Sequence, residues 1–110
     1  MVMNGVSDQS WIPYGRQSIT AADEEAVLAC LTGDFLTQGS AVPAFEAGLM
    51  EVTEASHAVA FNSATSALHS ACLALGLGPD DYLWTSPISF VASANCGLLC
   101  GAKVDFVDID

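Results

Sequence analysis

Apolar positions along the chain change their spacing about halfway along its length. In the first half they recur three and four positions apart, which is typical of helices that bury one face. Thr20-Ala21-Ala22-Asp23 resembles a capping box with Asp at its fourth position, so we expect a helix from here to Gly33. A second helix is expected over 41–54, with Ser40 able to cap it. Its inward face is expected to carry four apolar residues: Val42, Phe45, Leu49 and Val52.

The second half alternates short apolar runs with helical stretches. We expect strands at 57–61, 82–85 and 104–109, and helices at 64–75 and 89–100. Buried parallel strands have continuous apolar runs, and strands joined through helices pair in parallel by right-handed crossovers. From about residue 57 the order is therefore β-α-β-α-β, which predicts an α/β fold with a parallel sheet.

Three strands make a small sheet, and a parallel sheet normally has both faces covered by helices. No further helix follows the last expected strand. We therefore expect residues 11–110 to be an incomplete, amino-terminal portion of a larger domain. Residues 1–10 are polar and are expected to be a disordered lead-in.

The charge balance excludes several kinds of partner. Thirteen acidic residues stand against two basic ones, Arg16 and Lys103, for a net charge of −11. Two cations cannot neutralise a nucleic-acid backbone, and the charge equally disfavours anionic membranes. The sequence has neither a secretory signal at its start nor an uninterrupted apolar span, so we expect a cytoplasmic protein.

Cysteine and histidine give no metal-ligand pattern. The four cysteines, at 30, 72, 96 and 100, form no CxxC pair, and only His57 and His69 could join them, so no metal site is expected. We expect reduced, buried thiols, which suit a reducing compartment. The helical glutamates are expected to be solvated: Glu24, Glu25, Glu46, Glu51 and Glu54.

The segment 61–69, Phe-Asn-Ser-Ala-Thr-Ser-Ala-Leu-His, is the most informative stretch of the chain. It has the pattern of a strand end, a small polar turn and a helix start, where peptide N–H groups lack intrahelical partners and carry partial positive charge. Thr65 and Ser66 add hydroxyl donors, so a phosphate group fits this position. An ordinary capped helix, with Asn62 or Ser63 as the cap, is the alternative that the pattern leaves open.

Ligands of open α/β sheets bind beyond the carboxyl ends of the strands. Three segments are expected at that edge: 62–66, 86–90 and 108–110. Phe90 could present its ring to a planar ligand there or pack in the core. Motifs of the forms Gly-x-Gly-x-x-Gly, Gly-x-x-x-x-Gly-Lys-Ser/Thr and Gly-x-Ser-x-Gly are missing, so nicotinamide, P-loop and nucleophile-elbow sites are not supported.

Three motifs occur in order along the chain: Leu36-Thr37-Gln38-Gly39, the segment 61–69, and Trp-Thr-Ser-Pro-Ile-Ser-Phe-Val-Ala-Ser-Ala-Asn-Cys at 84–96. Together they resemble the amino-terminal part of the DegT/DnrJ/EryC1/StrS nucleotide-sugar aminotransferases, above all the members that act in pseudaminic acid biosynthesis. The resemblance runs from about Ile12 to Asp110. It implies a pyridoxal 5′-phosphate cofactor and the aspartate-aminotransferase-like fold of PLP-dependent transferases of fold type I.

The resemblance also implies roles for individual residues. The cofactor phosphate would lie on the turn formed by Ala64, Thr65 and Ser66, and Phe90 would stack on the pyridine ring. The sugar nucleotide would be contacted by Tyr14, Asp34, Phe35, Leu36, Thr37 and Ala64. Family members have their active site at a homodimer interface, so some of these contacts can serve the partner subunit.

The implied reaction moves an amino group, from glutamate, onto the C4 ketone of a UDP-linked deoxysugar. It requires a Schiff-base lysine and an acidic partner for the pyridine nitrogen, which in the family lie beyond the position of residue 110. Lys103 precedes the last strand, at the wrong end of the sheet, and is expected to be a surface residue. We therefore expect no catalytic residue in this chain and no activity from it alone.

Two alternatives remain open from the sequence. The chain could be a non-catalytic module that binds a phosphate ligand or a partner, or a truncated product without activity.

Overall fold

The computed structural model describes residues 15–108 and divides the chain into two compact units. The boundary lies between Ala41 and Val42. The lead-in expected over residues 1–10 lies outside the described residues. Within the described part of the chain, no helix is long and apolar enough to cross a membrane.

The first unit contains helix α1 (Ala21–Leu31), whose start is the predicted capping box. The Asp23 carboxylate accepts the Thr20 N–H at 2.7 Å, and the Thr20 hydroxyl accepts the Asp23 N–H at 3.4 Å. The backbone hydrogen bond from Thr20, and then that from its hydroxyl, lower the pKa of Asp23. Local hydrogen bonding therefore defines this helix, since none of its residues is buried.

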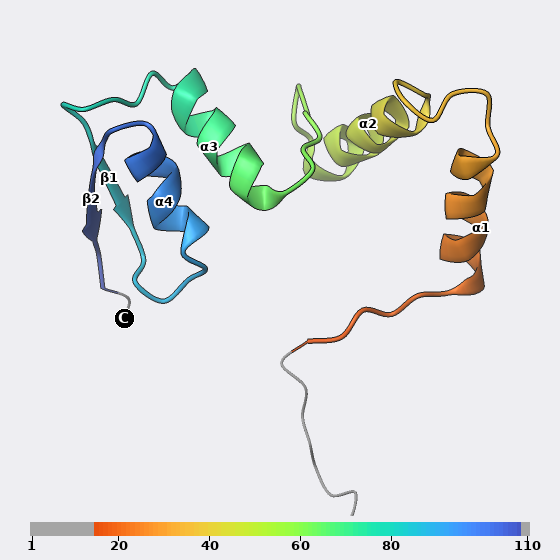
Figure 1. Cartoon of the computed structure of the whole chain (residues 1–110), viewed down its shortest axis with the longest axis horizontal. Coiled ribbons are helices and arrows are strands. Elements are labelled where there is room, and N and C mark those ends of the chain that lie inside the picture. The colour runs from red at the N-terminus through yellow and green to blue at the C-terminus, as the bar shows by residue number, and fades with distance from the viewer. Residues whose placement is uncertain (1–14, 109–110) are drawn as a thin grey trace, which may run out of the picture. The chain divides into compact units, whose positions relative to one another are not determined.

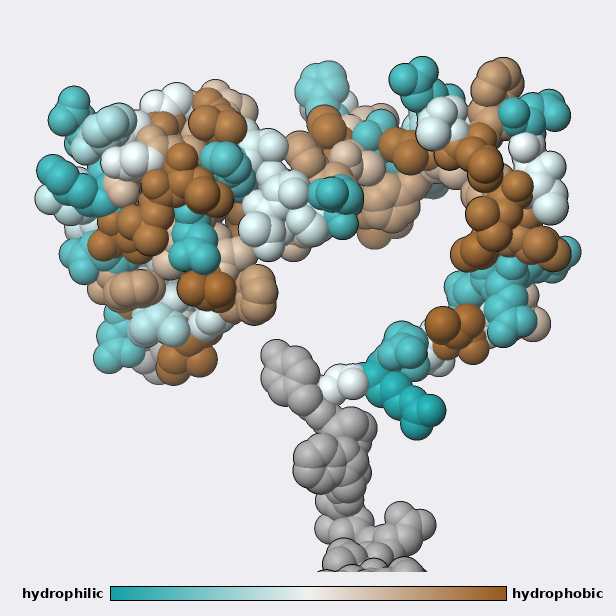
Figure 2. All heavy atoms as spheres, in the orientation of Figure 1, coloured by the Kyte–Doolittle hydropathy of each residue, from teal (hydrophilic) through white to brown (hydrophobic). Residues whose placement is uncertain are grey.

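Helix α2 (Ala41–Thr53) begins at the boundary between the units. The face that the sequence predicts to be inward is exposed, as are the large apolar residues of α1. Figure 2 shows these apolar side chains at the surface of both helices. The burial expected for α2 is wrong for this chain because the elements that pack closely together are the later ones.

The strand expected at 57–61 does not form within the described residues. After α2, Glu54 adopts a left-handed conformation with φ of 57°, and the chain turns back. A strand needs a hydrogen-bonding neighbour, and the sheet of the described residues contains only the two later strands. The Ala60 N–H instead donates to Oε1 of Glu46 in α2, at 2.8 Å.

The remaining elements are α3 (Ala64–Ala74), β1 (Tyr82–Thr85), α4 (Ala92–Leu99) and β2 (Lys103–Phe106). The two strands pair in parallel, with Tyr82 opposite Lys103 and Thr85 opposite Phe106. Helix α4 connects them and packs on both, and α3 packs on α4 (Figure 1). The expected α/β order is thus present from α3 onward, although α4 begins three residues later than the expected helix over 89–100.

Small residues bring α4 close to the sheet. The buried core consists of Cys72, Ala92, Cys96 and Ala102, and Gly97 of α4 is buried as well. A Cβ atom at Gly97 would lie 2.8 Å from Leu83 Cδ2 and 3.2 Å from Val104 Cγ2. Both strands therefore approach α4 at a position where only glycine fits.

We predict that Gly97→Ala lowers the free energy of unfolding by about 1–2 kcal/mol, because the added methyl group overpacks this contact. Gly48→Ala in α2 is the matched control, since nothing lies within 4 Å of a Cβ there. The control should raise the free energy of unfolding by about 0.5–1 kcal/mol, the gain of Ala over Gly in a helix. Urea denaturation measures both changes, and equal effects of the two substitutions would contradict the packing.

Candidate functional site

The start of α3 is fixed by Ser63, one of the two caps that the sequence allows. Its backbone is extended, with φ of −158° and ψ of 153°, and its hydroxyl accepts the Ser66 N–H at 3.2 Å. The Ser63 and Ser66 hydroxyls also lie in hydrogen-bond contact at 3.0 Å. The Ser63 carbonyl accepts the Ala67 N–H at 3.1 Å. The chain therefore enters the helix in one defined direction.

This cap leaves two backbone donors open. Within residues 15–108, the N–H groups of Ala64 and Thr65 have no hydrogen-bond acceptor. Both residues are exposed and Ser66 is half-buried, so the two amides and the Thr65 hydroxyl face solvent at the positive end of the helix dipole. Donors of this kind suit an anion with several acceptor oxygens. The residues present therefore fit the phosphate group of the expected cofactor.

Two serines order the loop between β1 and α4: Ser86 within the loop and Ser93 in the first turn of α4. The Ser86 hydroxyl accepts the Ile88 N–H at 3.2 Å, and the Ser93 hydroxyl donates to the Phe90 carbonyl at 2.9 Å. Phe90 is 75% exposed and lies two residues before α4. Of the two roles left open for this ring, packing in the core is not observed among the described residues. Its face is available to a planar ligand.

The two parallel strands end at a common edge, and α4 begins there, as Figure 1 shows. The second unit thus contains the expected cofactor residues: Ala64, Thr65 and Ser66 at the start of α3, and Phe90 before α4. Helix α4 begins on the side toward which the strands run, whereas α3 begins farther away, toward α2 (Figure 1). The topology matches the expectation that ligand-binding segments follow strand ends for 86–90, which follows β1. Segment 62–66 follows no strand among the described residues, because 57–61 does not pair with the sheet.

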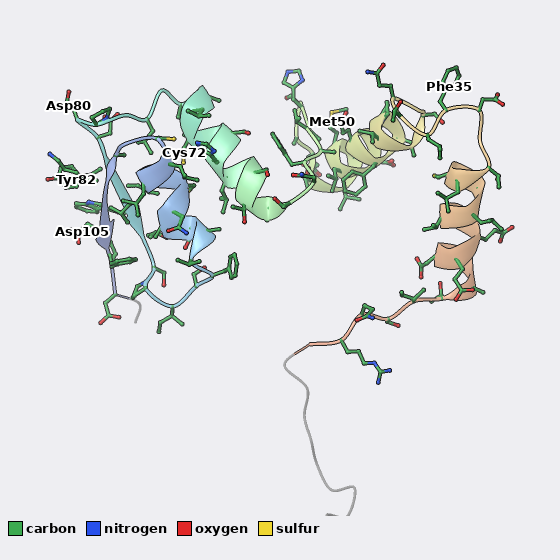
Figure 3. All side chains as sticks on the ribbon, in the orientation of Figure 1. Phe35, Met50, Cys72, Asp80, Tyr82 and Asp105 are labelled. Carbon is green, nitrogen blue, oxygen red and sulfur yellow. The ribbon has the colours of Figure 1, made fainter. Side chains whose placement is uncertain are left out.

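The residues expected to contact the sugar nucleotide lie mostly in the first unit. Asp34, Phe35, Leu36 and Thr37 form an exposed loop between α1 and α2, and Figure 3 labels Phe35 within it. Gln38 has a left-handed φ of 57°, and a Cβ at Gly39 would lie 2.8 Å from the Phe35 carbonyl oxygen. The loop therefore makes a tight turn at Gln38-Gly39. Tyr14 lies outside the described residues.

An open cavity of about 370 Å³ lies elsewhere, at the surface of the sheet. It is lined by Tyr82, Trp84 and Asp105, and Figure 3 labels the first and last of these. Its lining residues alternate with Leu83 and Val104, which approach α4, so it lies on the face opposite that helix. Lys103 is exposed on the same face, with its Nζ 5.2 Å from the centroid of the Tyr82 ring. Lys103 is thus a surface residue within this chain, as expected, and none of the predicted site residues lines the cavity.

The cysteines differ from the expectation of uniformly buried thiols. Cys72 and Cys96 are buried between α3 and α4, Cys100 is half-buried, and Cys30 on α1 is exposed. Cys30 is exposed like the rest of α1, of which no residue is buried. Burial raises the pKa of the Cys72 thiol, and the neighbouring Cys96 and Cys100 thiols raise it further.

Glu46 also differs from its expected place on a solvated helix face. It is half-buried and accepts the Ala60 N–H at 2.8 Å, three residues before the Ser63 cap. No sequence pattern marks this contact, because it depends on the chain folding back along α2. The apolar residues next to Glu46 in the sequence, such as Phe45, do not indicate this hydrogen bond.

Sequence comparison relates this chain to one family of enzymes. The model of the DegT/DnrJ/EryC1/StrS aminotransferase family matches residues 17–110. The chain belongs to this family. It is 44% identical over 98 residues to the UDP-4-amino-4,6-dideoxy-N-acetyl-beta-L-altrosamine transaminase of Campylobacter jejuni. The aligned region covers 89% of this chain and 26% of that protein. The chain therefore spans about a quarter of the length of this curated relative.

Solved structures of sugar aminotransferases share the fold. A candidate sugar aminotransferase from Streptococcus pneumoniae, Spr1654 in its PLP form, has a TM-score of 0.83 and 30% identity, covering 90% of this chain and 25% of that one. PseC of Helicobacter pylori, an aminotransferase involved in pseudaminic acid biosynthesis, has a TM-score of 0.83 and 38% identity over 89% of this chain and 27% of its own.

These structures confirm the fold class expected from the resemblance, that of the PLP-dependent sugar aminotransferases. The Streptococcus pneumoniae protein is known in both a PLP form and a PMP form. The cofactor of this family is thus pyridoxal phosphate, as the resemblance implied.

We predict that the cysteines of this chain react with iodoacetamide in a fixed order at pH 8, Cys30 first and the buried Cys72 and Cys96 last. Cys30 is exposed, whereas Cys72 is 8% exposed and has a raised pKa, so it holds less reactive thiolate at a given pH. Alkylation of Cys72 should rise further above pH 9, and peptide mass spectrometry follows both sites. Cys30→Ser should remove only the fast phase; equal rates at the two cysteines would contradict the packing of α3 on α4.

Proposed function

We propose that this chain supplies the amino-terminal portion of the cofactor-binding domain of a PLP-dependent nucleotide-sugar aminotransferase. The reaction would transfer an amino group from glutamate to the C4 ketone of a UDP-linked deoxysugar. The similarity to the altrosamine transaminase and to PseC supports a sugar of the pseudaminic acid pathway. When bound, pyridoxal phosphate supplies an electron sink for the carbon that exchanges its proton.

The observation that carries this proposal is the pair of open amides at the start of α3. Ala64 and Thr65 present N–H groups to solvent while Ser63 satisfies that of Ser66. The chain has two basic residues, so backbone amides and hydroxyls must supply much of the binding of any phosphate held by this chain. Phe90, with its exposed ring, would stack on the pyridine ring at the same edge.

The sugar nucleotide would contact the loop of Asp34, Phe35, Leu36 and Thr37, together with Tyr14 and Ala64. The exposure of Phe35 and Leu36 supports a contact role for this loop. Two apolar side chains at the surface are suited to covering the flat face of a base or sugar. The active site would lie at a homodimer interface, and the protein would act in the cytoplasm.

The lysine that binds the cofactor covalently would come from residues outside these 110. Lys103 lies in β2, on the face of the sheet that carries Tyr82. Lys103 is the first residue of β2, so it lies at the opposite end of the strand from the carboxyl edge where the cofactor would bind. These 110 residues alone would therefore be inactive as a transaminase.

We predict that replacing Thr65 and Ser66 together by alanine weakens PLP retention in the product of the complete open reading frame that encodes this chain. Each hydrogen bond lost to a charged phosphate costs about 1.5–3 kcal/mol. Fluorescence titration with PLP measures the change. The matched control is Ser70→Ala, which removes a hydroxyl from the same helix beyond its first turn.

Unchanged PLP affinity in the double variant would remove the Thr65 and Ser66 hydroxyls from the phosphate assignment. A wild-type protein that binds no PLP would reject the aminotransferase proposal and favour a non-catalytic module.

A further inference from the structure

Glu46 makes a contact that differs in kind from the other side-chain hydrogen bonds near the helix starts. Its carboxylate accepts the Ala60 N–H at 2.8 Å across a sequence separation of 14 residues. The capping bonds of α1 and α3 join residues three apart. Glu46 is half-buried, whereas Glu51 on the same helix is exposed. The Glu46 bond therefore holds together parts of the chain that local structure does not connect.

The segment that Glu46 holds has no other regular support among the described residues. Residues 57–61 pair with neither strand of the sheet, and the chain enters them from the left-handed turn at Glu54. Ala60 is half-buried, and a backbone N–H removed from water needs an acceptor. A carboxylate provides a charge-assisted bond, which is stronger than one to a neutral oxygen.

The position of Ala60 decides what this bond controls. Ala60 precedes the Ser63 cap by three residues. Even a fully extended chain of three residues reaches only about 10 Å. Fixing Ala60 against α2 thus limits where Ser63, and with it the start of α3 and its open amides, can lie. Figure 1 shows the segment before α3 turning back beside α2.

We propose that Glu46 is a positioning residue for the phosphate-binding start of α3. It acts through the Ala60 amide and does not touch the cofactor. This inference rests on the proposed function, because it assigns the contact a part in holding the PLP phosphate. It adds a residue that lies 18 positions before the first helical residue of that site, on a different helix.

The test compares Glu46→Ala, Glu46→Gln and the control Glu51→Ala in the product of the complete open reading frame. Amide hydrogen exchange, followed by NMR, is read at Ala60 and Ser66 and along α2 and α4. PLP affinity is measured on the same samples by fluorescence titration. Glu46→Gln keeps an oxygen that can accept the Ala60 N–H, so it separates the hydrogen bond from the charge.

We expect Glu46→Ala to speed exchange at Ala60 and Ser66 and to weaken PLP binding about tenfold, the loss of one hydrogen bond to a charged group. Exchange along α4 should be unchanged. Glu46→Gln should restore most of both, and Glu51→Ala should match the wild type.

Three results would overturn the inference: wild-type exchange at Ala60 and Ser66 in Glu46→Ala, no rescue by Glu46→Gln, or equal loss in Glu51→Ala. Faster exchange throughout α2 and α4 would show a general loss of stability and would also overturn it. A wild type that protects Ala60 but binds no PLP would instead reject the proposed function, leaving Glu46 as a structural anchor only.

Discussion

The hydrogen bond between the Ser63 hydroxyl and the Ser66 amide determines what α3 can offer to a ligand. Because this cap satisfies the third amide of the helix, the first two, at Ala64 and Thr65, stay open at the end where the helix dipole is positive. A chain with a net charge of −11 has few other means of binding an anion. The phosphate site therefore depends on backbone geometry, and that geometry depends on how the chain enters α3.

Two features hold this geometry from either side. Glu46 fixes the segment before the cap, and the packing of α3 on α4 fixes the helix after it. Helix α4 is in turn held against the sheet at Gly97, where no larger residue fits beside Leu83 and Val104. The site is thus supported by contacts with small residues and by a long-range hydrogen bond.

The sequence predicts much of this because the relevant signals are local. The capping box at Thr20, the cap at Ser63 and the strand at 82–85 follow from neighbouring residues. What it misses depends on tertiary context: the apolar run at 57–61 has no strand partner among the described residues, and Cys30 lies on a helix that nothing buries. Glu46 looks like a solvated glutamate until the chain folds back on α2. The family could be recognised because three motifs occur in order, at 36–39, 61–69 and 84–96. The family model confirms it by matching residues 17–110.

The most direct test of the account is the response of the backbone amides to the cofactor. In a ¹⁵N-labelled product of the complete open reading frame, titration with pyridoxal 5′-phosphate should shift the amide protons of Ala64 and Thr65 downfield more than those elsewhere in α3. Pyridoxal without its phosphate should leave them in place. Unmoved Ala64 and Thr65 amides at saturating pyridoxal 5′-phosphate would contradict the claim that this helix start holds the anion.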